Sequence, residues 1–181
     1  MPIGSYAAVP PLVQGLLQAR PRSVLDLGMG FGGGGVMVRE WLDQGVRPWK
    51  TFLAGVEAWP EYRNPVWDLY NVIYAQTIEK FLAGSRETFA CVLFCDVLEH
   101  FEKAAGRKML TAIQQRVAKG GRLFVTTPAK FFRQGAVYGN PRERHRSLWS
   151  KDELAGLGFR VRRVGSQAYF CGECWFAEWQ S

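Results

Sequence analysis

Two hydrophobic patterns alternate along most of the chain. Near-continuous apolar runs, typical of strands that are buried on both faces of a sheet, stand at residues 23–27, 51–56, 71–75, 89–95 and 123–127. Between these runs, apolar residues recur at the spacing of amphipathic helices, at residues 35–43, 78–82 and 104–118. We expect Gly120 and Gly121 to end the last of these helices. Strands that alternate with helices predict a parallel, doubly wound α/β sheet.

The two ends of the chain extend this pattern. An amphipathic helix is expected within residues 1–20, from the spacing of Leu12, Val13, Leu16 and Leu17. A short helix is expected to begin at Ser150, because Glu153 supplies the second half of a capping box. Residues 129–149 before it are irregular.

Two further strands are expected at residues 159–164 and 168–178. Gly165 and Ser166 separate them, a connection too short for a helical crossover. The two strands must therefore pair antiparallel, as a hairpin at the end of the sheet.

Length and composition fit one globular domain. The chain has 181 residues, of which 48% are hydrophobic and 14% aromatic, so an intrinsically disordered protein is excluded. The length leaves no room for a separate substrate domain. The formal net charge of +7 suggests an anionic partner. However, residues 130–163 hold nine of the 23 basic residues and three of the 16 acidic ones, so the positive excess belongs to one segment.

Targeting and cysteine signals are weak. No apolar run approaches the roughly 20 residues of a membrane span, and the uncharged N-terminal stretch lacks the features of a signal peptide. We therefore expect a cytoplasmic protein without membrane association. Cys171 and Cys174 are three apart on an expected strand and so point to opposite faces, which makes a zinc site improbable.

The strongest local motif lies at residues 24–32, which read Val-Leu-Asp-Leu-Gly-Met-Gly-Phe-Gly. Glycines that follow a strand and open a helix let the backbone turn tightly and touch a ligand. The glycines also fit the dinucleotide pattern G-x-G-x-x-G. Against a dinucleotide, the Asp26 carboxylate would repel a pyrophosphate but welcome an ammonium group. Glu57, at the end of the second strand, suits either ligand, because a carboxylate there can accept two ribose hydroxyls.

With this motif and four others in order, residues 20–178 resemble the class I S-adenosylmethionine-dependent methyltransferases, especially small bacterial members with a D-x-L-E-H motif. The other four motifs are Gly55-Val-Glu57, Asp96-Val-Leu-Glu99-His100, Gly120-Gly121-Arg-Leu-Phe-Val-Thr-Thr-Pro128 and Leu154…Gly158-Phe159. The resemblance implies one domain over residues 1–181 with a Rossmann-like sheet of seven strands, mostly parallel, ending in the antiparallel hairpin. It also implies methyl transfer from S-adenosylmethionine to a small-molecule acceptor by in-line displacement.

The resemblance assigns roles to residues at the strand ends. Gly28, Gly30 and Gly32 would lie against the methionine moiety and the ribose, and Asp26 would hold the loop or reach the ammonium through water. Glu57 would bind the ribose diol. For the remaining contacts, it implies Trp59 over the adenine, Gln76 or Thr77 at its amino edge, and Asp96 beside the sulfonium.

Candidate catalytic residues are Asp96 and the two histidines, His100 and His145. His100 could equally cap or pack at the start of a helix. Residues 129–150 are expected to form a loop or lid on the substrate side, with Tyr138, Arg142 and Arg146 as substrate-binding residues.

Three alternatives stay open. Asp96, Glu99, His100 and His145 resemble the metal ligands of small-RNA 2′-O-methyltransferases, which would make the chain a metal-assisted O-methyltransferase acting on RNA. The favoured interpretation has no metal, because D-x-L-E-H is widespread in relatives that use none. The chain could also be a cofactor-binding module without catalysis. The sequence leaves the oligomeric state open.

Overall fold

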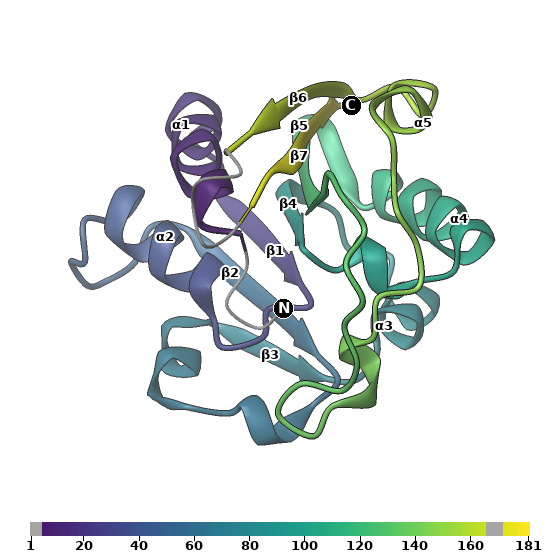
Figure 1. Cartoon of the computed structure of the whole chain (residues 1–181). Helices are drawn as coiled ribbons and strands as arrows, with labels where there is room; N and C mark the ends of the chain where they lie inside the picture. The colour runs from purple at the N-terminus through teal and green to yellow at the C-terminus, as the bar shows by residue number, and fades with distance from the viewer. Residues whose placement is uncertain (1–4, 166–171) are drawn as a thin grey trace.

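The computed structural model describes residues 5–165 and 172–181, and these residues form one seven-stranded sheet. The strand order is β3-β2-β1-β4-β5-β7-β6 (Figure 1). The first five strands are parallel: β1 (Ser23–Leu27), β2 (Phe52–Glu57), β3 (Val72–Ala75), β4 (Phe89–Cys95) and β5 (Val117–Pro128). β7 (Cys174–Gln180) runs antiparallel to both β5 and β6 (Arg160–Val164). The predicted mostly parallel sheet with a terminal antiparallel pair is confirmed.

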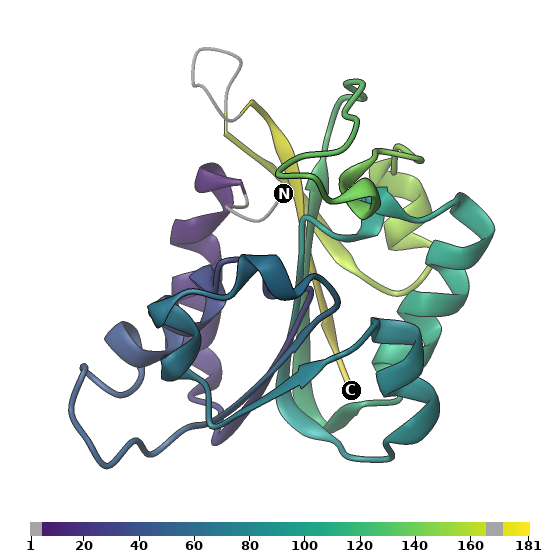
Figure 2. The same cartoon turned by 90° about the horizontal axis from the view of Figure 1, so that it is seen from below.

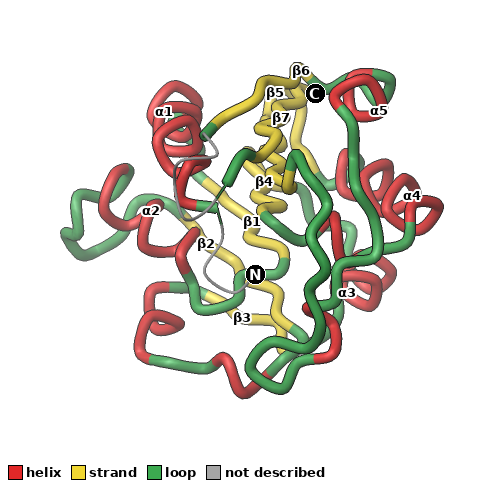
Figure 3. Tube along the Cα trace, in the orientation of Figure 1, coloured by secondary structure: helices red, strands yellow, loops and turns green. Residues whose placement is uncertain are grey.

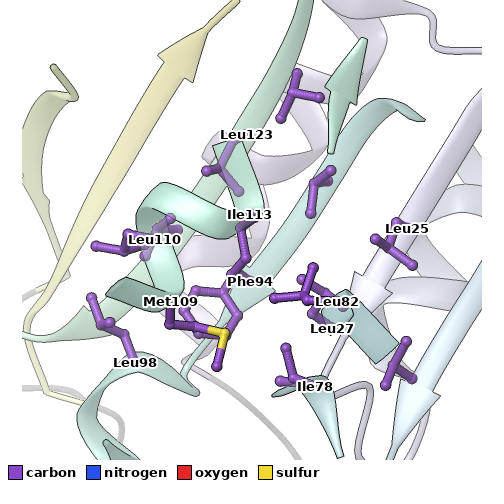
Figure 4. Packing of buried hydrophobic residues seen from close by; sticks show 14 of the residues in the cluster. Leu25, Leu27, Ile78, Leu82, Phe94, Leu98, Met109, Leu110, Ile113 and Leu123 are labelled. Carbon is purple, nitrogen blue, oxygen red and sulfur yellow. The ribbon is translucent and has the colours of Figure 1, made fainter. Parts of the chain in front are cut away.

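Helices cover both faces of the sheet, as Figure 2 shows. One face carries α1 (Val9–Ala19) and α2 (Gly33–Trp41), and the other carries α3 (Ile78–Gly84), α4 (Lys103–Gln114) and α5 (Lys151–Ala155). Each layer has its own apolar cluster. On the α4 side, Met109, Leu110 and Ile113 pack toward Phe94 and Leu98 (Figure 4). Because the central strands are apolar on both faces, they hold the two clusters together.

The N-terminal helix lies close to the sheet. The predicted helix within residues 1–20 is α1, which begins after the short 3-10 turn η1 (Tyr6–Ala8). Leu12, Val13 and Leu16 are buried, whereas Leu17 is 40% exposed on the outer face. A Cβ atom at Gly15 would come within 2.6 Å of the Phe124 ring, so only glycine permits this approach.

The expectation that Gly120 and Gly121 end a helix is wrong. The helix α4 stops at Gln114, and both glycines lie inside β5. The pairing of β4 with β5 shifts register there, between Phe89 and Cys91, and Gly120 takes a φ of 75°. The glycines therefore serve a bulge that realigns two buried strands.

Other element boundaries differ by smaller amounts. The helix α2 covers 33–41 rather than 35–43, and the predicted capping box of Ser150 and Glu153 opens α5. Residues 168–171 of the last expected strand, including Cys171, lie outside the described residues. Cys174 is on β7, and β5 separates that strand from β4, which carries Cys91 and Cys95. Among the described helices, none has the length and apolar character needed to cross a membrane.

Candidate active site

The carboxyl ends of the parallel strands open into a cavity of about 310 Å³. The segment between β5 and α5 runs past this edge of the sheet and is almost entirely loop (Figure 3). The cavity wall combines both regions: Gly28, Gly30, Val56, Glu57, Ala58, Thr77, Ile78, Glu79, Asp96, Val97, His100, Phe101, Glu102, Asn140, Arg142, Glu143 and Arg146. Most site residues expected from the sequence therefore gather in one place.

The glycine loop after β1 is shaped by its backbone conformation. Gly28, Gly30 and Gly32 have φ values of 72°, 53° and 92°, a region that glycine alone enters freely. A Cβ atom at Gly28 would lie 2.6 Å from Val97, across the cavity floor. Gly32 caps α2 and does not line the large cavity. The loop thus presents bare backbone at Gly28 and Gly30.

Glu57 is fixed at the end of β2. Its Oε2 accepts a hydrogen bond from Gly30 N at 3.0 Å, and its Oε1 accepts one from Trp59 N at 2.8 Å. Burial raises the pKa of this carboxyl. Each carboxylate oxygen keeps a second lone pair, so the side chain can still accept hydrogen bonds from a ligand in the cavity.

Asp26 is buried behind the glycine loop. Its Oδ2 accepts a hydrogen bond from the Tyr70 hydroxyl at 2.6 Å, and that hydroxyl accepts one from Gly35 N at 3.0 Å. Burial raises the pKa of Asp26 to about 6, and the Glu57 charge adds to this effect. Asp26 therefore holds the loop and the start of α2 together, as one of its two expected roles requires. Tyr70 lies 44 residues away, and no sequence signal pointed to it.

Asp96 stands where two cavities meet. It has a φ of 53°, and its N–H donates to Thr126 O at 2.9 Å. Its carboxylate accepts two hydrogen bonds from Ser5, from N at 2.6 Å and from Oγ at 2.8 Å. Asp96 and Gly28 line both the large cavity and a smaller one of about 110 Å³. The two cavities are therefore adjacent at these two residues.

His100 lines the large cavity, whereas His145 is buried and does not line it; the two ring centroids are 5.2 Å apart. His100 Nδ1 is 3.3 Å from Arg144 O, and His145 Nδ1 is 3.0 Å from Phe132 O. A carbonyl oxygen only accepts, so both Nδ1 atoms carry the hydrogen and both Nε2 atoms carry the lone pair. Burial lowers the pKa of His145 and lowers that of His100 to about 3, so both are neutral at pH 7.

Glu99 completes a cluster with the histidines. One possible ligand atom from each of Glu99, His100 and His145 lies within 4.8 Å of the other two. Thr127 Oγ1 donates to Glu99 Oε2 at 3.0 Å, and burial raises the pKa of Glu99 to about 8. The structure thus brings together three of the four residues considered as metal ligands, while the Asp96 carboxylate is bonded to Ser5.

The substrate-side loop is braced by a buried polar network. The Tyr62 hydroxyl donates to Glu143 Oε1 at 2.9 Å and accepts from Asn140 Nδ2 at 3.1 Å. Asn140 also caps the 3-10 turn η5 (Pro141–Glu143), accepting from Arg142 N at 3.0 Å. The 3-10 turn η5 therefore holds Arg142 at the cavity wall. The sequence pattern had predicted only an irregular segment there.

The other expected substrate residues lie around Arg142. Arg146 is on the cavity wall, with Nη1 3.7 Å from Glu102 Oε1. Tyr138 is 62% exposed and packs edge-on against Phe31 and Tyr62, outside the cavity wall.

Two expected adenine contacts are placed differently. Trp59 packs against the apolar cluster on the α1 side, and its neighbour Ala58 lines the cavity instead. Gln76 is also outside the wall, whereas Thr77 lines it and caps α3 through its Oγ1, which accepts from Lys80 N at 3.2 Å. The apolar lining residues at this end are the aliphatic Val56, Ala58 and Ile78.

Comparison with known proteins decides the family. The model of a methyltransferase domain family matches residues 6–161. The chain belongs to the class I S-adenosylmethionine-dependent methyltransferases. No curated protein sequence matches this methyltransferase significantly.

Solved structures share the fold of the methyltransferase at low sequence identity. The 1,6-didemethyltoxoflavin-N1-methyltransferase of Burkholderia thailandensis, solved with 1,6-didemethyltoxoflavin and S-adenosylhomocysteine, has a TM-score of 0.68 and 20% identity, over 97% of this chain and 79% of its own. The N-methyltransferase NodS of Bradyrhizobium japonicum WM9, in complex with S-adenosylhomocysteine, has a TM-score of 0.61 and 15% identity, over 95% and 86% of the two chains. Magnesium protoporphyrin IX methyltransferase from Synechocystis PCC 6803, with bound S-adenosylmethionine, has a TM-score of 0.61 and 16% identity, over 94% and 76%.

The cofactor of the methyltransferase is S-adenosylmethionine, and the strand-end cavities have the chemistry to hold it. A Cβ atom at Gly34 would lie 2.3 Å from Asp26 Oδ2, so bare backbone is required here as well as at Gly28. Carboxylates at Glu57 and Asp96 suit hydroxyl and cationic groups.

Proposed function

We propose that this methyltransferase methylates a small-molecule acceptor in the large cavity, with the cofactor lying across the junction between the two cavities. The observation that carries the proposal is that Gly28 and Asp96 line both spaces. The adenosine part fits the Glu57 side of the large cavity, and the amino-acid end fits the smaller cavity. This arrangement brings the sulfonium to Asp96.

The residues on the Glu57 side bind the adenosine part by shape and by hydrogen bonds. Glu57 accepts from the ribose hydroxyls while Gly30 and Trp59 hold its carboxylate still. Ala58 and Ile78 give the adenine an apolar wall, and Thr77 faces its edge. The bound cofactor supplies an electrophilic methyl group on a sulfonium.

His100 is the residue we assign as proton acceptor. Its Nε2 carries a lone pair and lies on the cavity wall. Burial disfavours the imidazolium and lowers the pKa of His100 to about 3, so Nε2 would hold the proton only briefly, with Glu143 Oε2 3.8 Å away to offset part of that cost. His145 packs against His100 and acts through it rather than on the acceptor.

The position of Arg142 favours a methyl acceptor that carries a carboxylate or a phosphate group. In the described part of the chain, no ion pair joins Arg142 to another residue, although Asn140 fixes its backbone. A guanidinium at a cavity wall suits planar bidentate binding of such an anion.

A methyl-transfer assay over neutral and anionic small molecules tests this function. For an anionic acceptor, Arg142→Ala should raise KM about tenfold to a hundredfold, the loss of a charged hydrogen bond. Arg144→Ala is the matched control, because Arg144 is exposed on the same segment and off the cavity wall. Methylation of no small molecule, or equal effects of the two substitutions, would contradict the proposal.

A second candidate is a metal-assisted O-methyltransferase, which the sequence linked to RNA. The convergence of Glu99, His100 and His145 favours it, because both Nδ1–H groups are held by carbonyls and the buried His145 Nε2 has no hydrogen-bond partner within residues 5–165 and 172–181. Such carbonyl contacts are typical of metal-binding histidines. Calorimetry with Mn²⁺ tests it: binding that His145→Ala abolishes would support a site, and no binding would exclude it. Comparing RNA with small molecules in the transfer assay tests the acceptor.

A further inference from the structure

We infer that the start of the described chain completes the cofactor site: Ser5 positions Asp96, and with Thr126 it encloses the amino-acid end of S-adenosylmethionine. The inference rests on the proposed placement of the cofactor. Ser5 has no role in the motifs of the sequence, and its contribution follows from contacts across 91 residues.

The smaller cavity has two unlike walls. The inner wall comes from strand ends and the glycine loop, with the polar side chains of Asp26, Asp96 and Thr126. The outer wall comes from the N-terminal segment, which contributes Ser5, Ala8, Val9 and Leu12. Without that segment the cavity would be an open edge of the sheet, and the charged end of a ligand there would face water.

Ser5 joins the outer wall to the inner one. Both of its donors, N and Oγ, bind the Asp96 carboxylate, and both residues are buried. Hydrogen bonds to an ionised carboxylate are stronger than those between neutral groups. Asp96 also has a left-handed φ of 53°, which residues other than glycine seldom adopt without support. The two bonds from Ser5 therefore fix the carboxylate at the junction of the cavities.

Thr126 gives an independent sign of a ligand in the smaller cavity. Its side chain is fully buried and lines the cavity, and its Oγ1 has no hydrogen-bond partner among the described residues beyond the weak contact of the Cys95 thiol. A buried hydroxyl left in this state costs free energy. A ligand with an ammonium and a carboxylate, an α-amino acid group, supplies the partner that the Thr126 hydroxyl lacks.

This arrangement predicts selectivity between two related ligands. S-adenosylhomocysteine carries the amino-acid end, and 5′-methylthioadenosine lacks it but shares the adenosine and sulfur. Residues of the smaller cavity should affect only the first ligand. A general loss of structure would weaken both.

Calorimetric titration of the full chain with both ligands tests the inference. Ser5→Ala removes the Oγ donor, and Thr126→Val removes the buried hydroxyl with little change in shape. Each substitution should weaken the binding of S-adenosylhomocysteine about tenfold, which corresponds to the loss of one hydrogen bond to a charged group. The affinity for 5′-methylthioadenosine should stay within about twofold of the wild-type value. Ser85→Ala, in the loop after α3, is the control and should change neither affinity.

The outcomes separate the two proposals. Equal weakening of both ligands by Ser5→Ala and Thr126→Val, or no weakening of S-adenosylhomocysteine by either, overturns this inference alone. A wild-type protein that binds neither ligand overturns the proposed function and this inference with it.

Discussion

Asp26 lies within β1, Glu57 ends β2 and Asp96 follows β4, and each of these carboxylates has a different set of donors. Asp26 is bonded to a tyrosine hydroxyl, Glu57 to two backbone N–H groups and Asp96 to a serine. A sequence motif shows that an acid stands at a strand end but not which donors reach it. These donors decide whether an acid braces the loop or faces the ligand.

Asp26 should make stability depend on pH. Burial raises the pKa of Asp26 to about 6 in the folded protein, against about 3.9 for an ordinary aspartate, so the folded state holds the proton more tightly. The stability that this proton contributes is complete below the unfolded pKa and is lost as pH rises through the folded pKa. Between about pH 4 and 7, the wild type should lose up to about 3 kcal/mol of unfolding free energy relative to Asp26→Asn.

Urea unfolding of the two proteins across this pH range measures the effect. Asp68→Asn, at an exposed position in the 3-10 turn η3 (Pro65–Leu69), is the control and should track the wild type. A constant difference between wild type and Asp26→Asn at all pH values would show that Asp26 ionises normally.

The sequence identified most of the strand-end residues but not their partners. Gly28, Gly30, Glu57 and Asp96 were found because local motifs mark them. Tyr70 and Ser5 were missed, since they reach their acids only through tertiary packing across tens of residues.

At the scale of elements, the segment after β5 shows how a loop becomes part of a site. From Arg142 to Trp149 every second side chain is buried, so the arginines face outward while Glu143, His145, Ser147 and Trp149 face inward. Trp149 is fully buried against α4, where a Cβ atom at Gly106 would lie 2.6 Å from its ring. This anchor fixes the segment that carries His145 and Arg142.

Trp149→Ala should therefore destabilise the whole fold. Removal of a fully buried tryptophan costs about 3–5 kcal/mol, because a cavity is left in the α4-side cluster. The free energy of unfolding in urea measures the loss. Trp41→Ala is the control, because that side chain is 47% exposed, and it should cost much less. Similar losses for the two variants would contradict the role of Trp149 as an anchor.

The predicted helices and strands were correct where interactions between residues close in the sequence determine them. The capping box of Ser150 and Glu153 is such an interaction, because its two hydrogen bonds lie within one turn. The prediction that Gly120 and Gly121 end a helix was wrong because glycines can either end a helix or form a bulge. Only the pairing of β5 with its neighbour β4 distinguishes the two.

At the scale of the whole molecule, the charge pattern separates two regions. In the basic stretch 130–163, Arg160 and Arg163 of β6 pair with Glu178 on β7 and with Glu173 just before it. The arginines of the substrate-side loop instead border the large cavity at Arg142 and Arg146. The positive excess of the chain is thus partly neutralised on the hairpin, whereas Arg142 and Arg146 place positive charge beside the large cavity, with Arg146 3.7 Å from Glu102.

The sheet itself was predictable because its physics is simple. Apolar strands alternating with helices pack in parallel, and a short connection forces the last pair to be antiparallel. Two cavities that share Gly28 and Asp96 were not predictable, since their walls come from both ends of the chain.

Calorimetric titration of Glu57→Gln with S-adenosylhomocysteine measures directly whether the cofactor binds at the end of β2. Glutamine keeps the size of the side chain but loses the charge that accepts from two ribose hydroxyls. Glu61→Gln, at an exposed position nearby, is the matched control. We expect micromolar-range or tighter binding by the wild type and the control, and about tenfold to hundredfold weaker binding by Glu57→Gln. Equal affinity of all three proteins, or no binding by the wild type, would contradict this expectation.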